Sequence, residues 1–559
     1  MKRDRKQIKR ILLISPFQVT SEGYDVEAVL SNGYYAEPPL GLAYIAAVTE
    51  KEKKYVVEIY DAHIEAIRYI FKEKRADLEE LFGLIENKIK EFNPDLIGIS
   101  CMFHTTYRMA HKICEIAKKF NKEIITVMGG SYPNTSFKEA LGDKNLDYVL
   151  LSEGELSFPK LIDDLNKGRD VSNNDGIVFI KDGNLVHQLK TEYIQNLDSL
   201  PLPSRHLLPI KEYNKYSQHA FHKFTSDPIN VVTMTGSRGC PFNCAFCQTS
   251  RLWGRKLRYR SAKKVVEEIE TLVKDYGATH IALNDDNITY SRKFMMEFTG
   301  LLIEKNIDIK WLVAGGLYAR SLDDELVERM VKSGHTFFNL AVESGSKEVL
   351  KRVRKPVILD QMPDIIKMIR KYDNTYVTGF FVLGFPFETK EQINQTLDIS
   401  SKLDLDWRVF SIFQPFPGTD LYDECIKDGF IDKNLDFEKL SLRNAQISTP
   451  NFDKEYLQKV SYLANLKDNF LNNRNLAYGD IDQAINDFKW VIKKVPKHGI
   501  AHYCLGRAYL KKGLIDDAAA EMQKAKSIVM EDEKNKSYFK HFKIDLDNEI
   551  NKMMIKTSI

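Results

Sequence analysis

Short apolar runs alternate with amphipathic segments along the first 165 residues of this 559-residue chain, and no other feature limits its possible folds as strongly. Such runs separated by helical patterns are typical of a parallel sheet with helices on both faces. We therefore predict a doubly wound, Rossmann-like α/β domain over residues 1–165, with ligands bound at the carboxyl ends of its strands. The apolar runs are RILLISP, YVVEIYDA, DLIGISC, EIITVMGG and LDYVLLSEGE.

A second alternation fills residues 226–432. Its six candidate strands are INVVTMTG, HIALND, IKWLVAGG, FFNLAVES, VTGFFVLGFP and WRVFSIFQPF. Six strand–helix units are too few for a closed eight-fold barrel. We predict an open, TIM-like (β/α)6 partial barrel with its functional site at the carboxyl ends of the strands.

Three further segments connect or follow these domains. Residues 166–225 are rich in turn dipeptides and prolines, which indicates a linker with a small hairpin, and residues 433–464 form a connecting segment. In residues 465–559, Gly479 and Gly513 are 34 residues apart, and 34 residues is the period of a tetratricopeptide helix pair. We predict an α-helical repeat segment that either binds a protein partner or braces the barrel.

The composition excludes several classes of protein. Net charge is only +3, from 81 basic and 78 acidic side chains, so no strong field favours nucleic acid as a partner. No apolar stretch approaches the roughly 20 residues of a membrane span, and the basic start MKRDRKQIKRILLISP lacks the cleavage site of a secretion signal. Seven cysteines in so long a chain do not form a disulfide framework. We expect a cytoplasmic protein without a membrane span.

Three of the seven cysteines lie in the segment GSRGCPFNCAFCQTS, which follows the first barrel strand. Cys240, Cys244 and Cys247 have the spacing C-x3-C-x2-C. A structural zinc site normally needs four ligands, and neither His222 upstream nor Cys425 downstream has zinc-ribbon spacing. A cubane iron–sulfur cluster has four corners, so three thiolates can hold three of them and leave one iron open. We predict a [4Fe–4S] cluster at the mouth of the barrel.

This loop resembles the signature of the radical S-adenosylmethionine (SAM) superfamily, and the resemblance extends over residues 229–432. The family carries an aromatic residue before the last cysteine, here Phe246. The stretches LNDDNIT, AVESGS and GFFVLGFPFET resemble its SAM-binding motifs. The resemblance implies that SAM contacts Phe246, Asp285, Asp286, Glu343, Ser344, Gly379 and Gly384.

The same resemblance implies a mechanism. The open iron would hold SAM, and a one-electron donor such as flavodoxin or ferredoxin would supply the electron that cleaves it. The resulting 5′-deoxyadenosyl radical would abstract hydrogen from an unactivated carbon, with Cys240, Cys244 and Cys247 as the catalytic ligands of the cluster. The protein's share is orientation and the exclusion of water and oxygen.

The first domain resembles the cobalamin-binding domain of cobalamin-dependent radical SAM enzymes. The stretches that carry this resemblance are EPPLGLAYIAA, GISCMFHTT, GGSYPN and SEGE. Small residues at strand ends let a bulky corrin and its nucleotide tail approach the backbone. The resemblance implies cobalamin contacts from Pro39, Gly41, Ser100, Thr105, Gly129, Gly130, Glu153 and Gly154.

Two histidines could compete for cobalt. DAHIEA is similar to the D-x-H-x-x-G motif of methionine-synthase-like domains, but Ala66 stands at the glycine position. We therefore interpret His63 as a surface or strand-end histidine. His104 follows another strand end, and we interpret it as a loop histidine whose own hydrogen bonds are satisfied.

Cobalamin next to a SAM radical implies a methyltransferase. It would use the radical and methylcobalamin to methylate an unactivated carbon, or phosphorus, of a small-molecule or peptide substrate. The alternative is a cyclase or rearrangement enzyme of the same class. A methylthiotransferase would need three further clustered cysteines, whereas only Cys101 and Cys114 lie in the first domain. A non-catalytic binding scaffold would not need the intact cysteine triad.

Overall fold

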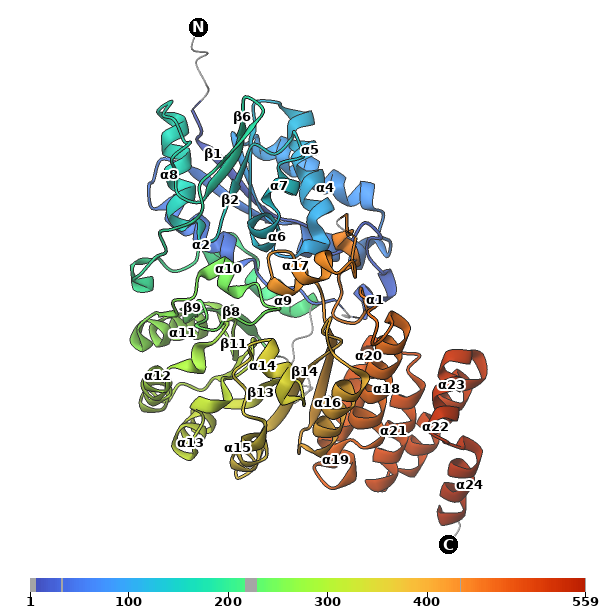
Figure 1. Ribbon diagram of the computed structural model, residues 1–559. Coiled ribbons are helices and arrows are strands. Elements are labelled where there is room, and N and C mark those ends of the chain that lie inside the picture. The colour runs from blue at the N-terminus through green and yellow to red at the C-terminus, as the bar shows by residue number, and fades with distance from the viewer. Residues whose placement is uncertain (1–6, 32–33, 217–228, 433, 558–559) are drawn as a thin grey trace.

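The computed structural model describes the chain except for residues 1–6, 32–33, 217–228, 433 and 558–559. The end of the predicted linker, the first residues of the predicted barrel segment and His222 lie outside the described residues. Figure 1 shows an N-terminal α/β domain above a barrel, with a helical C-terminal segment beside the barrel. This arrangement confirms the predicted fold class.

The N-terminal sheet has five parallel strands in the order β2-β1-β3-β4-β5. The hairpin predicted in the linker is present, but it extends this sheet, because β6 pairs antiparallel with β5 and β7 pairs with β6. The strands are β1 (Arg10–Ser15), β2 (Val56–Asp61), β3 (Leu96–Ser100), β4 (Ile125–Gly129), β5 (Tyr148–Leu150), β6 (Ile177–Lys181) and β7 (Asn184–His187).

Helices cover both faces of this sheet. Leu12 and Ile14 of β1 belong to the core under α3, α4 and α5, whereas Ile11 and Leu13 belong to the core under α2 and α8. Both faces of the strand are buried, which explains why its sequence is an unbroken apolar run. The helices are α1 (Val26–Leu30), α2 (Leu40–Glu50), α3 (Ala62–Glu73), α4 (Leu78–Phe92), α5 (Tyr107–Phe120), α6 (Ser131–Thr135), α7 (Phe137–Ala140) and α8 (Gly154–Asn166).

The barrel sheet has six parallel strands that lie side by side in chain order, which confirms the predicted partial barrel. The strands are β8 (Val231–Met234), β11 (His280–Leu283), β12 (Lys310–Val313), β13 (His335–Glu343), β14 (Tyr376–Leu383) and β15 (Trp407–Ile412).

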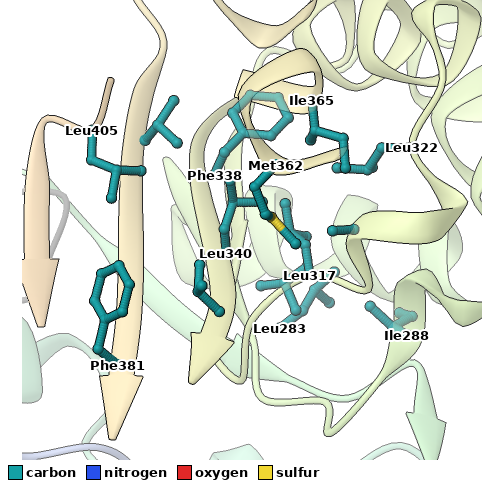
Figure 2. Packing of buried hydrophobic residues seen from close by; sticks show 14 of the residues in the cluster. Leu283, Ile288, Leu317, Leu322, Phe338, Leu340, Met362, Ile365, Phe381 and Leu405 are labelled. Atoms are coloured by element: carbon teal, nitrogen blue, oxygen red, sulfur yellow. The ribbon is translucent and has the colours of Figure 1, made fainter. Parts of the chain in front are cut away.

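Helices cover the outer face of the barrel sheet. Figure 2 shows Phe338 of β13 beside Met362 and Ile365 of the α15 region, within one apolar core. The helices are α9 (Ile210–Tyr216), α10 (Thr249–Trp253), α11 (Ala262–Tyr276), α12 (Arg292–Glu304), α13 (Asp324–Lys332), α14 (Lys347–Arg352), α15 (Met362–Ile369), α16 (Lys390–Lys402) and α17 (Asp420–Lys427).

The C-terminal segment is helical, as predicted. Helices α20 and α22 begin at Ile481 and Ile515, which reproduces the 34-residue spacing of the sequence. That these helices are tetratricopeptide repeats stays a prediction. The helices are α18 (Lys454–Leu466), α19 (Arg474–Ala477), α20 (Ile481–Lys494), α21 (Gly499–Lys511), α22 (Ile515–Glu531), α23 (Glu533–His541) and α24 (Leu546–Thr557).

This segment packs on the inner face of the barrel sheet. Phe470 and Phe488 share a core with inward-facing strand residues such as Phe337 and Trp407. The side chain of Asn469 also pairs with edge strand β15: its Oδ1 accepts from the Arg408 backbone N–H at 2.7 Å, and its Nδ2 donates to the Arg408 carbonyl at 2.7 Å. The C-terminal helices thus cover an edge and a face that an open barrel would leave exposed.

Candidate functional site

The cysteine loop leaves β8 and is tied down at its base. Asp285, at the end of β11, accepts hydrogen bonds from the backbone N–H of Gly236 at 3.0 Å and from the hydroxyl of Ser237 at 2.6 Å. Two short strands, β9 (Ser237–Arg238) and β10 (Arg258–Tyr259), then pair antiparallel and close the loop. The cysteines therefore lie on a loop that has a fixed base.

The cysteine loop opens onto a cavity with about 1010 Å³ of empty space. Cys240, Cys244 and Cys247 line it, and all three are half-buried free thiols. Within the described parts of the chain, no three His, Cys, Asp or Glu side chains are close enough together to bind one metal ion. An iron–sulfur cluster does not need that convergence, because each thiolate binds a different iron.

Burial favours the neutral form of two of these thiols, Cys240 and Cys244. Burial raises the pKa of Cys240, and it raises the pKa of Cys244 to about 12, although the nearby Lys355 opposes that shift. At Cys240, Asn287 opposes the shift, because its Nδ2 donates to the sulfur from 3.6 Å and so favours the thiolate. Since metals bind the thiolate, assembly of a cluster here releases protons. Three sulfur donors around one roomy cavity fit the predicted cluster.

Three of the predicted SAM contacts line the same cavity. The ring of Phe246 packs against Phe385, with centroids 5.4 Å apart. Asp286 faces the cavity and accepts from the Thr249 hydroxyl at 3.0 Å, and burial raises its pKa to about 6. Glu343 has a φ of +64°, a strained backbone region for a non-glycine residue, which ends β13 with the carboxylate at the cavity.

Four predicted SAM contacts lie elsewhere. Asp285 is buried beneath the cysteine loop, and its carboxylate serves the loop backbone. The Ser344 hydroxyl bonds Thr396 at 3.1 Å and is fully buried. A Cβ on Gly379 would lie 2.6 Å from Leu405, and one on Gly384 would lie 2.6 Å from Leu457. These glycines allow close packing within the barrel and against α18, and their contact with SAM stays a prediction.

Other residues of the cavity had not been predicted. Lys355 forms an ion pair with Glu343 at 2.6 Å, and its position between α14 and α15 carries no motif that could have revealed it. Gly315 and Gly316 follow β12, and the sequence VAGG at this strand end was a usable signal. A Cβ on Gly315 would lie 2.5 Å from the Asp285 carbonyl oxygen, so only glycine fits there.

A second cavity, with about 810 Å³ of empty space, lies at the carboxyl ends of the N-terminal strands. Pro39 and Thr105 do not line it. Six of the eight predicted cobalamin contacts do: Gly41, Ser100, Gly129, Gly130, Glu153 and Gly154.

The lining of this second cavity combines apolar walls with strand ends that carry no side chain, which suits a corrin with its nucleotide tail. Its walls include the apolar side chains of Leu13, Val127 and Phe158. Gly130 has a φ of +109°, and a Cβ there would lie 2.4 Å from the Cys101 carbonyl oxygen. A Cβ on Gly154 would lie 2.9 Å from Ile45. An added side chain would displace the backbone beside Gly130 or the cavity wall at Ile45, so both positions require glycine, and the apolar lining with its bare strand ends fits cobalamin.

Neither candidate histidine lines the second cavity. His63 is 1% exposed, so it is not a surface histidine, but it does follow the end of β2, as the other half of the interpretation held; its Nδ1 lies 2.8 Å from the Tyr24 hydroxyl. His104 is also buried, and its Nε2 lies 2.9 Å from the Thr135 hydroxyl. Burial lowers the pKa of each ring to about 4, so both stay neutral and engaged in their own hydrogen bonds.

The Glu153 carboxylate is bound by other parts of the protein, which argues against its contacting cobalamin. It is 1% exposed and accepts from Arg258 of the barrel at 2.7 Å and from the Ile194 backbone N–H at 2.7 Å. Glu153 therefore lines the second cavity while its charged end holds the barrel and the segment after β7.

Two family matches coincide with these two cavities. The radical SAM superfamily matches residues 234–399, which include the cysteine loop. The B12 binding domain matches residues 26–162, which include all six predicted residues of the second cavity.

Two similar proteins cover most of the chain. An uncharacterized methyltransferase of Pyrococcus horikoshii is 30% identical over 458 residues, which are 81% of this chain and 91% of the relative. The cytidylyl-2-hydroxyethylphosphonate methyltransferase of Streptomyces wedmorensis is 30% identical over 478 residues, 79% of this chain and 87% of the relative.

A solved structure shares the fold. The cobalamin-dependent SAM radical enzyme OxsB, with aqua-cobalamin and SAM bound, matches with a TM-score of 0.59 at 15% identity. The match covers 97% of this chain and 81% of that chain.

Among the described residues of the present chain, none of the helices has the length and apolar character needed to cross a membrane.

Proposed function

Since this chain belongs to the radical SAM superfamily and carries a B12-binding domain, we propose that it is a cobalamin-dependent methyltransferase. Its cofactors are a [4Fe–4S] cluster, SAM and cobalamin. The acceptor in this proposal is an unactivated carbon, or phosphorus, of a small molecule or peptide.

One observation carries this proposal: helix α10 joins the two cavities. Thr249, its first residue, and Cys247, two residues earlier, line the cavity of the cysteine loop. Leu252 and Trp253, at its end, line the cavity of the N-terminal domain. Figure 1 shows α10 between the two domains. A helix of five residues is only about 7 Å long, so both cavities border one short element.

The residues of the first cavity suit the binding of a zwitterion. When bound, the cluster and cobalamin supply the electron transfer and the methyl carrier that no side chain can provide. Asp286 and Glu343 present carboxylates that can accept hydrogen bonds from an ammonium group. Lys355 presents a cation beside Glu343, which suits a carboxylate. Phe246 and Met362 supply apolar walls that exclude water.

Anaerobic reconstitution with iron and sulfide tests the cluster site. We expect the wild-type protein to hold iron and to cleave SAM to 5′-deoxyadenosine after chemical reduction. Replacing all three loop cysteines with alanine should abolish both, and iron that survives this triple change would contradict the assignment. The matched controls are single alanine replacements of the buried thiols Cys101, Cys114, Cys425 and Cys504.

Methyl-labelled SAM tests the reaction type. In the presence of hydroxocobalamin and a candidate acceptor, a methyltransferase transfers the label to the product. A cyclase or rearrangement enzyme would form an unlabelled product. The electron donor in the cell, such as flavodoxin or ferredoxin, and the cytoplasmic location are further parts of this proposal.

The C-terminal segment supports a bracing role in this proposal, because its apolar side packs on the barrel. Recruitment of a protein partner stays a prediction. Truncation after residue 460 separates the two roles. If the segment braces the barrel, the truncated protein should be insoluble or lack its cluster. If the segment recruits a partner, the truncated enzyme should still cleave SAM but no longer turn over its own substrate.

A further inference from the structure

Four buried charges join the N-terminal domain to the base of the cysteine loop. Arg238 of β9 and Arg258 of β10 are 7% and 4% exposed, and Glu153 and Glu155 at the start of α8 are 1% and 7% exposed. Arg238 donates to Glu153 at 3.2 Å and to Glu155 at 2.5 Å, while Arg258 donates to Glu153 at 2.7 Å. Two cations and two anions thus form a balanced cluster away from water.

Arg238 contacts three of the elements that line the second cavity. Its guanidinium lies 5.3 Å from the ring centre of Tyr44 on α2 and 5.2 Å from that of Trp253 on α10. Glu153, Glu155 and Trp253 themselves line that cavity. Arg238 also precedes Cys240 by two residues. One side chain therefore links the start of the cysteine loop to α2, α8 and α10.

We propose that Arg238 is a positioning residue that couples the two cofactor sites, so that an ordered cysteine loop strengthens cobalamin binding and bound cobalamin strengthens cluster binding. This proposal rests on the proposed function, since it assigns the cluster to the cysteine loop and cobalamin to the second cavity. A shift of the loop would separate Arg238 from its two carboxylates and leave Arg238 and Glu155 buried without partners, which is strongly unfavourable. The position of the cysteine loop and the position of the cobalamin site therefore depend on each other. Such coupling is reciprocal, so each bound cofactor strengthens the binding of the other.

Titration of the full-length protein with hydroxocobalamin, followed by its absorbance, measures the coupling. The titration is done with the cluster loaded and again after the cluster is removed with a chelator. For the wild type we expect the loaded protein to bind more tightly, by a factor within the roughly 5–150-fold range typical of coupled sites. For Arg238→Met we expect that ratio to fall close to one.

The matched control is Arg292→Met. Arg292 also pairs with two carboxylates, Asp323 at 2.6 Å and Glu325 at 2.7 Å, but it lies exposed on α12. Its ratio should equal that of the wild type. A merely structural role for Arg238 would weaken both titrations by the same factor and leave the ratio unchanged, and that result would overturn the proposal.

Two further measurements keep the test decisive if Arg238→Met does not fold. Glu155→Gln keeps the shape of the side chain and one hydrogen bond to Arg238 but removes the charge, so its ratio should lie between those of the wild type and one. The wild-type ratio needs no variant, and a value of one refutes the coupling. A wild-type protein that binds no iron or no cobalamin would instead refute the proposed function.

Discussion

Replacing Phe470 with alanine should loosen the barrel from a distance. Phe470 is 1% exposed, and its ring lies 5.6 Å from Trp407 of β15, 5.8 Å from Phe488 and 4.8 Å from His498. It is one of the side chains through which the C-terminal segment contacts β15, the edge strand of the barrel. Its neighbour Asn469 holds the backbone of that strand.

The size of the effect follows from this burial. Removing a fully buried phenylalanine side chain costs about 3–5 kcal/mol, and ring contacts on three sides leave little room for the site to collapse. We expect about 4 kcal/mol for the docking of the segment, which corresponds to roughly thousandfold faster exchange of the amides that docking protects. Hydrogen–deuterium exchange of the peptide that covers β15 is the assay.

A matched variant separates docking from general stability. Phe539 is also buried, but its ring partner is Tyr503 within the C-terminal segment. Phe539→Ala should accelerate exchange in α21 and α23 and leave β15 protected. Unchanged protection of β15 in Phe470→Ala, or equal acceleration of β15 in both variants, would refute the idea that this segment braces the barrel.

Three further outcomes are expected. His63→Ala should bind cobalamin with an unchanged absorbance spectrum, and loss of a histidine-bound spectrum would show that His63 reaches cobalt. Gly130→Ala should lower the melting temperature and weaken cobalamin binding, because backbone strain of this kind costs about 1–3 kcal/mol before the 2.4 Å overlap is counted, whereas Gly168→Ala has open space and should bind cobalamin normally. Burial lowers the pKa of His335 to about 3. Between about pH 6.5 and pH 3, this histidine is therefore protonated in the unfolded chain but neutral in the folded barrel. The free energy of unfolding should therefore fall by about 1.4 kcal/mol for each unit that the pH falls in this range. Urea unfolding at pH 7 and pH 5 should show a smaller loss of stability for His335→Phe than for the wild type. An equal loss in both proteins would contradict this role of His335.

The sequence predicted the strands of both sheets because burial on two faces leaves an unbroken apolar run with turn residues at its end. The run from Arg10 to Ser15, in which four apolar residues precede the turn, is an example. The cysteine loop could also be predicted from the sequence, since the spacing of its cysteines and its place after β8 are both local features. Local order of this kind needs no knowledge of distant contacts.

The roles of neighbouring motif residues could not be predicted in the same way. Asp285 and Asp286 are adjacent and chemically identical, yet one holds the cysteine loop and the other faces the cavity. The difference depends on which side of the strand end the loop crosses. Gly384 carries a motif signal, but its close neighbour is Leu457, more than seventy residues later in the chain.

Contacts between domains were also invisible in the sequence. Glu153 sits in a stretch that suggested cobalamin, and only the fold reveals Arg238 and Arg258 as its partners. The pairing of Asn469 with the backbone of Arg408 is another case. Its side-chain amide makes hydrogen bonds that a neighbouring strand would otherwise make, and no sequence pattern marks such a residue.

Metabolite mass spectrometry tests the central claim most directly. Cells that carry the gene, cells that lack it, and cells that carry the variant with all three loop cysteines replaced by alanine are grown with methyl-labelled methionine. The account predicts a compound that is heavier than its precursor by one CH2, carries the label, and appears only with the intact gene. A compound that forms equally with the triple variant, or one that depends on the gene but carries no label, would contradict methylation by the cysteine-loop site.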